Sequence, residues 1–277
     1  MRNASPARES SPSADGAATD AVSGLTPGRV LYGLYAWLQF VLIALLTLGL
    51  LLLLPSLRAR RRLTRGAARL ALSLAGMRVR VHGLGALPSP CVVVANHVSY
   101  LDGVMLHGVL PIRFDFVIKR EMSSVPLAGL LLRRLGAEFV ERRGRAQGLG
   151  DARRLLRLAS AGKALVFFPE GTFGPASGLG HFHIGAFAAA VRAGVPVVPI
   201  AIRGTRHCLP PGSFWPRPGR IDVQLLPPLA LPEPPSQSSK PANGMPAVPE
   251  RDDRAAQLRD RTHAVLAAAL QTGAAPA

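Results

Sequence analysis

The sequence predicts an α/β fold: a mixed, mostly parallel sheet of about seven strands flanked by helices, with an N-terminal membrane-associated helical segment. Two patterns support this prediction. Between residues 77 and 232, short runs rich in Val, Ile and Phe alternate with Leu- and Ala-rich stretches, which is typical of a sheet covered by helices. Ahead of that region, the 24 residues Leu31–Leu54 contain no charged side chain.

Residues 1–28 are rich in Ser, Ala, Pro and Gly, a composition typical of a disordered tail. Residues 29–76 are predicted to form two helices. At ~1.5 Å per residue, Leu31–Leu54 is long enough to cross the ~30 Å hydrocarbon core of a bilayer with some tilt. Arginines cluster directly after it, which predicts that its C-terminal side lies in the cytoplasm. A re-entrant or interfacial hairpin would satisfy the same pattern.

The second of these helices, Leu57–Ala75, is basic and amphipathic. Its residues Arg58, Arg62, Arg65 and Arg69 recur at helical spacing and form one stripe. Such a stripe can lie on an anionic membrane surface, where each arginine contributes about 1 kcal/mol. Alternatively, the helix packs against the rest of the chain and the stripe is a solvated face. The sequence leaves both interpretations open.

Residues 77–232 are expected to form one domain. Seven strands are expected in it, at Arg78–His82, Cys91–Ala95, Phe114–Ile118, Glu138–Glu141, Ala164–Phe168, Val197–Ile202 and Ile221–Leu225. Helices are expected at Tyr100–Val109, Pro126–Leu135, Leu149–Ala161 and Ala186–Ala193. A Pro-rich linker over 233–250 precedes a C-terminal amphipathic helix and tail over 251–277.

The charge of the chain suggests an anionic partner. Lys and Arg number 33 against 16 Asp and Glu, so the formal net charge is +17. Nucleic acid, an acidic membrane surface and a phosphorylated substrate all fit such a balance. Aromatic residues make up only 5%, and base stacking needs exposed rings, so no nucleic acid is expected. The two cysteines, Cys91 and Cys208, form neither a disulfide framework nor a zinc-ligand spacing, and Cys91 is expected to be buried.

The stretch VVVANHVSYLD places His97 and Asp102 just after an apolar strand. Ser99 and Asp102 have the spacing of a capping box, which predicts a helix from Tyr100. His97 then lies in the strand-to-helix loop, where its ring can turn towards the carboxylate. A carboxylate bonded to one ring nitrogen leaves the other nitrogen basic, as in the base and orienting residue of a catalytic triad. Alternatively, Asp102 only caps the helix and His97 packs.

Other strands also end in polar residues. GAEFVERR ends in Arg142 and Arg143, and LVFFPEGTFG breaks into Glu170, Gly171 and Thr172. Glycine lets the backbone approach a ligand closely, and a threonine can cap a helix or donate a hydrogen bond. In sheets of this kind, sites gather at the C-terminal ends of strands. The sequence therefore predicts that a base, a cation and a polar turn meet at one edge of the sheet.

Four segments, NHVSYLD, GAEFVER, FPEGT and VPVVPIAI, resemble in order and interval the four blocks of the glycerolipid acyltransferase family. The bacterial prototype of that family is the membrane-bound 1-acylglycerol-3-phosphate acyltransferase. The resemblance covers about Met77 to Pro232. It implies that a fatty acyl group moves from an acyl thioester, on coenzyme A or acyl carrier protein, to the hydroxyl of a lysolipid.

The resemblance also implies roles for individual residues. His97 matches the general base and Asp102 its orienting partner. Arg142 matches the arginine that holds the acceptor's phosphate, and Glu170, Gly171 and Thr172 match the block that positions the acceptor. No metal or organic cofactor is expected, since the thioester is already activated.

The implied location is the inner (cytoplasmic) membrane, with the catalytic domain facing the cytoplasm and an anionic membrane surface as a partner. The implied product is phosphatidic acid, made from 1-acylglycerol-3-phosphate. A pair of histidines, His181 and His183, is not expected to bind a metal, because no acidic or cysteine partner lies nearby in sequence.

The chain departs from the family at two positions. Phe173 stands where many members have an arginine, and His183 where many have a lysine. Two cations expected near an anionic head group are therefore absent, and Arg143, Lys119 or Arg120 would have to assist Arg142. Another lysolipid, such as a lyso-ornithine lipid or a lysophospholipid, is the alternative acceptor. A non-catalytic protein that binds lipid surfaces is the alternative function.

Overall fold

A computed structural model of the chain describes residues 26–141, 145–174, 178–233 and 250–272. Nearly all of the expected N-terminal tail, most of the linker and the end of the C-terminal tail lie outside the described residues. Arg142 and Arg143 also lie outside them.

The described residues contain one seven-stranded sheet in the order β1-β7-β6-β2-β5-β3-β4. Its strands are β1 (Met77–His82), β2 (Val92–Ala95), β3 (Phe114–Lys119), β4 (Glu138–Val140), β5 (Ala164–Phe167), β6 (Val197–Arg203) and β7 (Gly219–Leu225). Neighbouring strands are parallel, except that β6 and β7 run antiparallel. The predicted mixed, mostly parallel sheet is confirmed, and each expected strand is found within two residues of its predicted ends.

The central strands are buried on both faces, which explains their nearly continuous apolar sequence. On β2, Val93 and Ala95 belong to one hydrophobic cluster, whereas Val92 and Val94 belong to the other. This alternation follows from the two-residue period of a strand. The sheet therefore separates two apolar cores, each closed by its own helices.

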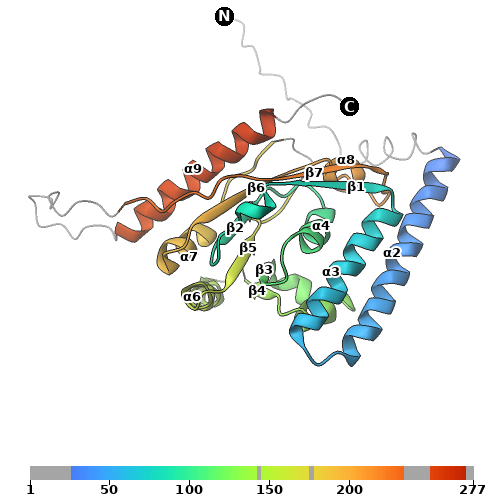
Figure 1. Cartoon of the computed structure of the whole chain (residues 1–277), viewed down its shortest axis with the longest axis horizontal. Coiled ribbons are helices and arrows are strands. Elements are labelled where there is room, and N and C mark those ends of the chain that lie inside the picture. Colours follow the sequence, from blue (N-terminus) through green and yellow to red (C-terminus); the bar gives the residue numbers. More distant parts are fainter. Residues whose placement is uncertain (1–25, 142–144, 175–177, 234–249, 273–277) are drawn as a thin grey trace, which may run out of the picture.

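Helices cover both faces of the sheet (Figure 1). They are α2 (Pro27–Leu53), α3 (Leu57–Leu74), α4 (Leu101–Val109), α5 (Ala128–Arg134), α6 (Arg145–Ser160), α7 (Gly185–Ala193), α8 (Thr205–Cys208) and α9 (Glu250–Thr272). The first core contains side chains of α3 and α4, and the second those of α6, α7 and α9. Two short 3-10 turns, at Leu84–Ala86 and Arg120–Ser123, and the one-turn helix α8 were not predicted.

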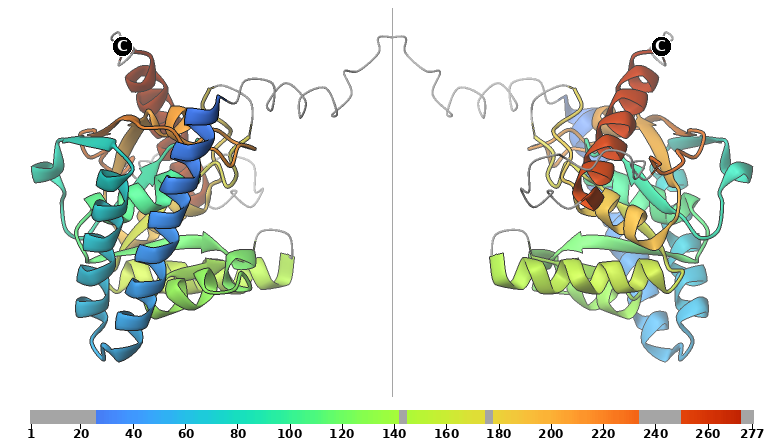
Figure 2. Two further views of the ribbon diagram at one scale, coloured as in Figure 1. Left: turned by 90° about the vertical axis from the view of Figure 1, so that its right-hand side faces the viewer. Right: turned by 90° about the vertical axis from the view of Figure 1, so that its left-hand side faces the viewer.

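The two N-terminal helices form a hairpin on the outside of the domain, with α2 beside α3 (Figure 2). Polar side chains of α2 form hydrogen bonds with the C-terminal part of α3: Tyr32 donates to the carbonyl of Ala75, and Gln39 to that of Ala71. The Trp37 indole donates to Phe214 O at 2.6 Å. Among the described helices, α2 alone is long and apolar enough to cross a bilayer, by length and composition.

The arginine stripe of α3 is partly used inside the protein. Arg65 and Arg69 donate to the carbonyls of Gly108 and Val109, at the C-terminal end of α4. Free carbonyls at a helix end attract cations, so these bonds fasten α4 to α3. These two residues are therefore partly engaged with α4, although Arg69 stays exposed, so both interpretations of the stripe remain open. Arg58 and Arg62 are exposed.

Candidate functional site

The predicted histidine and aspartate are in contact. His97 Nδ1 lies 2.9 Å from Asp102 Oδ2. The carboxylate is fully buried, whereas the imidazole keeps 17% of its side-chain surface exposed. The contact arises because β2 ends at Ala95 and α4 begins at Leu101, so the intervening loop folds His97 back over the first turn of the helix. Sequence alone left open whether these two residues would meet.

Asp102 organises this loop through a single oxygen. The backbone N–H groups of Val98 and Ser99 donate to Oδ2 at 2.7 and 2.8 Å, in addition to the imidazole. Ser99 Oγ accepts from the N–H of Leu101 and donates to Leu209 O. Only half of the predicted capping box forms: Asp102 accepts from the N–H of Ser99, whereas the N–H of Asp102 donates to the backbone carbonyl of Ser99 and not to its hydroxyl. The helix, however, begins at Leu101, one residue later than predicted.

Two further residues hold the histidine loop in place. Glu170 Oε1 accepts from the backbone N–H of His97 at 2.8 Å, and its Oε2 accepts from the N–H of Gly180. Asn96, which is buried, exchanges two hydrogen bonds with the backbone of Ile202 on β6. Glu170 thus positions His97, a contact that the sequence did not suggest. The sequence offered one signal for the role of Asn96: it is an amide residue directly after a predicted buried strand.

Aromatic rings enclose the imidazole. Phe168 stacks on His97 with ring centroids 4.2 Å apart. Phe173 meets His97 edge-on at 4.5 Å and meets Tyr100 edge-on at 4.7 Å. The residue that replaces the expected arginine therefore forms an apolar wall beside the candidate base. These ring contacts were not predicted, because they depend on loops that approach one another only in the folded chain.

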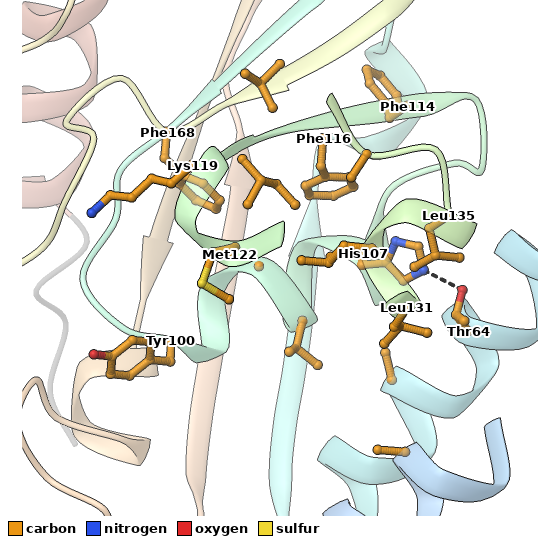
Figure 3. A pocket seen from close by; sticks show the side chains of 18 of the residues that line it. Thr64, Tyr100, His107, Phe114, Phe116, Lys119, Met122, Leu131, Leu135 and Phe168 are labelled. Atoms are coloured by element: carbon orange, nitrogen blue, oxygen red, sulfur yellow. Dashed lines mark hydrogen bonds between the residues drawn. The ribbon is translucent and has the colours of Figure 1, made fainter. Parts of the chain in front are cut away.

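A largely apolar cavity of about 480 Å³ opens beside these residues (Figure 3). His97, Tyr100, Gly171, Thr172 and Phe173 lie on its wall. Helices α2 and α3 supply a further part of the lining, as do β3 and α5. Gly171 has a φ of +78°, a conformation that favours glycine, and no helix begins at Thr172.

Polar side chains of α3 and α4 also line the cavity. His107 of α4 and Thr64 of α3 both line it, and His107 Nε2 lies 2.8 Å from Thr64 Oγ1. Burial, and then the nearby charges of Arg61 and Arg65, lower the pKa of His107 from 6.5 to about 4. The ring is therefore neutral near pH 7. Arg61 itself pairs with the buried Asp115.

The candidate helper cations differ in their surroundings. Lys119 lines the cavity. Arg120 instead pairs with Asp151, whose Oδ2 also accepts from the N–H of Glu141 at 2.7 Å. Asp151 therefore anchors the chain immediately before Arg142. The predicted phosphate-binding role of Arg142 stays a prediction, since that residue lies outside the described ones.

Neither cysteine is suited to nucleophilic chemistry. Burial raises the pKa of the Cys91 thiol, and likewise that of Cys208, to about 11, so both are protonated near pH 7. The rings of His181 and His183 are 6.0 Å apart. Within the described ranges, no three His, Cys, Asp or Glu residues gather where they could hold a metal ion.

This geometry suits proton transfer at the cavity wall. A neutral imidazole whose Nδ1–H is held by a carboxylate presents a basic Nε2. Such a group can take a proton from a hydroxyl that approaches it, without first forming a covalent bond to substrate.

Comparisons with known proteins agree on one family. The profile of the Acyltransferase family matches residues 78–203. The lyso-ornithine lipid O-acyltransferase of Rhizobium meliloti is 34% identical over 207 residues, covering 69% of this chain and 68% of that protein. The chain belongs to the acyltransferase family. A chloroplastic 1-acyl-sn-glycerol-3-phosphate acyltransferase of Brassica napus is 37% identical over 136 residues, or 48% of this acyltransferase-family chain.

A solved structure has the same fold as this family member. The crystal structure of the 1-acyl-sn-glycerophosphate acyltransferase PlsC from Thermotoga maritima matches with a TM-score of 0.69 and 22% identity. The match covers 90% of this acyltransferase-family chain and 99% of that chain. The chain spans 39% of the length of the Brassica napus relative and 57% of that of a lyso-ornithine lipid O-acyltransferase from Pseudomonas aeruginosa.

Proposed function

We propose that the protein is a membrane-associated O-acyltransferase that moves a fatty acyl group from an acyl thioester to the hydroxyl of a lysolipid. The donor is acyl-CoA or acyl-ACP, and the first candidate acceptor is 1-acylglycerol-3-phosphate, which would give phosphatidic acid. The proposal is carried by the 2.9 Å contact between His97 and Asp102 at the wall of an apolar cavity. A base at the edge of a space that fits alkyl chains is the arrangement that this reaction needs.

In the proposed reaction, His97 Nε2 takes the proton of the acceptor hydroxyl as its oxygen attacks the thioester carbonyl. Asp102 stabilises the imidazolium that forms. When the tetrahedral intermediate collapses, the carbon–sulfur bond breaks and the thiolate leaves with the proton from Nε2. The new ester and the free thiol account for all atoms, so no cofactor is needed.

Membrane attachment is assigned to the outer face of α2. Exposed leucines run along this helix at Leu31, Leu34, Leu38, Leu42, Leu45, Leu46 and Leu53. Because the inner face of α2 packs on α3 and lines the cavity, a bilayer around the outer face would deliver lipid chains to the cavity directly. We assign this location to the inner membrane, with the catalytic domain on the cytoplasmic side where thioester carriers occur.

Phe173 favours lyso-ornithine lipid as a second candidate acceptor. The rings of Phe173 and Tyr100 offer aromatic surface to a cation, whereas a phosphate dianion gains nothing from them. Ornithine carries an ammonium group. Relatives from Rhizobium meliloti and Pseudomonas aeruginosa bear the name lyso-ornithine lipid O-acyltransferase. Arg142 and Lys119 favour the phosphate acceptor instead.

The test is acyl transfer by membranes that contain the protein. Labelled acyl-CoA and acyl-ACP are crossed with lysophosphatidate, lyso-ornithine lipid and lysophosphatidylcholine, and His97→Ala is compared with the unchanged chain. We expect one acceptor to be used and His97→Ala to lose transfer by roughly 10²-fold or more while melting normally. Undiminished transfer in a folded His97→Ala protein would reject this base. No transfer to any acceptor, with vesicle binding intact, would favour a non-catalytic lipid-surface protein.

A further inference from the structure

His107 presents an unused hydrogen-bonding atom to the cavity. Its Nε2 is bonded to Thr64, but its Nδ1 has no hydrogen-bond partner among the described residues. Nδ1 is also not among the fully buried polar atoms that lack a partner, so packing does not seal it. Figure 3 shows the ring among Phe116, Leu131 and Leu135, which are apolar. A plain alkyl chain here would cover this nitrogen without satisfying it.

The hydrogen bonds of Thr64 indicate whether Nδ1 of His107 is a hydrogen-bond donor or an acceptor. The Thr64 hydroxyl lies 3.0 Å from the backbone carbonyl of Arg60 and 3.3 Å from that of Arg61, both in the preceding turn of α3. When its single hydrogen points to either carbonyl, its oxygen accepts from His107, and Nε2 then carries the ring's hydrogen. A neutral imidazole has only one N–H, which leaves Nδ1 as a bare acceptor. It needs a donor from whatever occupies the cavity.

We propose that this cavity selects an acyl chain that carries a hydroxyl group, with His107 Nδ1 accepting the hydroxyl hydrogen. The inference rests on the proposed function, because it treats the cavity as the acyl-chain site. His107 lies five residues beyond Asp102, a rise of roughly 7.5 Å along α4. The recognised hydroxyl is therefore several carbons from the reacting ester, near the middle of a long chain. A keto group at the same carbon offers only an acceptor and is disfavoured.

The test is a positional series of hydroxyhexadecanoyl thioesters, each compared with hexadecanoyl thioester and with the matching oxo compound. We expect one hydroxyhexadecanoyl isomer to exceed the plain hexadecanoyl chain by about tenfold in kcat/KM. The matching oxo compound should have a lower kcat/KM than the plain chain. The same series on the acyl chain of the lysolipid shows whether donor or acceptor occupies the cavity. If no hydroxy isomer raised kcat/KM on either the donor chain or the lysolipid chain, the inference would be overturned.

Variants separate recognition from folding. His107→Leu should bring the hydroxy and plain chains to within about twofold, whereas the same change at exposed His82 on β1 should leave the preference intact. Thr64→Val removes the acceptor that fixes the tautomer, so discrimination between hydroxyl and oxo should shrink while the hydroxyl preference over the plain chain stays. A hydroxyl preference that survives in His107→Leu would contradict the proposal.

Direct binding distinguishes failure of this inference from failure of the proposed function. Free hydroxyhexadecanoic and hexadecanoic acids compete for the detergent-solubilised full chain, with no turnover required. Tighter binding of one hydroxy acid, lost in His107→Leu, supports the hydroxyl site even if no acyl transfer occurs. Rapid acyl transfer without any hydroxyl preference leaves the proposed function standing and rejects the hydroxyl site.

Discussion

At the scale of single residues, the site depends on how one carboxylate is shared. Asp102 Oδ2 accepts from the His97 ring and from two backbone N–H groups, so it fixes both the orientation of the base and the path of the loop. Glu170, in the turn after β5, supports the same loop by accepting from the N–H of His97. Removing either carboxylate should therefore disturb His97 without touching a substrate atom.

Asp102→Asn should lower kcat by roughly 10²–10⁴-fold, because an amide stabilises the imidazolium poorly and does not favour the required tautomer. The apparent KM for the thioester should change much less. Steady-state kinetics with a melting curve for each protein checks this. Near-normal kcat in a folded Asp102→Asn variant would show that Asp102 only caps α4.

Arg142→Ala should raise the KM for a phosphate-bearing acceptor by about tenfold or more, since a phosphate loses its charged hydrogen bonds. The KM for the acyl donor should hardly move. Arg133→Ala, which removes an exposed arginine of α5, is the matched control. If only the donor's KM responded, Arg142 would belong to the donor site.

At the scale of elements, the contact between α3 and α4 connects the N-terminal helical hairpin to the candidate site. Arg65 and Arg69 bond the carbonyl end of α4, while Asp102 and the His97 loop occupy its other end. Thr64 and His107 add a buried polar contact between the two helices. The stability of this contact between α3 and α4 should depend on pH, because burial keeps His107 neutral.

The folded pKa of His107 is about 4 and its ordinary value is 6.5, so between these values the unfolded chain binds more protons than the folded one. This part of the stability is complete above about pH 6.5 and is lost as the pH falls towards 4. It amounts to on the order of 3 kcal/mol at most. Melting temperatures in detergent should fall more steeply with acid for the unchanged chain than for His107→Leu, with His82→Leu as control. If the melting temperatures of the unchanged chain and of His107→Leu fell equally with acid, His107 would not be a buried neutral ring.

At the scale of the whole molecule, α2 carries two different faces, one exposed and apolar and one packed on the domain. The outer face of α2 carries exposed leucines along its length, and other side chains of α2 donate to backbone carbonyls of α3 and of Phe214. The cavity lies between this hairpin and the sheet. With the outer face of α2 in a bilayer, as proposed, a lipid chain would reach the base without crossing open water.

Leu38→Glu combined with Leu45→Glu should weaken binding to phosphatidylethanolamine–phosphatidylglycerol vesicles by at least about tenfold, because two charges replace apolar side chains at the lipid face. Transfer between detergent-dispersed substrates should persist, since neither leucine lines the cavity. Val81→Glu on β1 is the control at an exposed site away from α2. Unchanged vesicle sedimentation of the double variant would place the membrane contact elsewhere.

The sequence by itself determined the periodic features: seven strands, the main helices, an uncharged segment of membrane length, and a histidine and an aspartate at a strand end. These follow from local patterns, since residue spacing decides which side chains share a face. Only the tertiary structure decided that Asp102 meets His97, that Glu170 holds the His97 backbone, and that Phe173 and His107 line one cavity. The Glu170 and Phe173 contacts join segments far apart in the chain, and even the His97–Asp102 contact, between residues five apart, depends on how the loop before α4 packs.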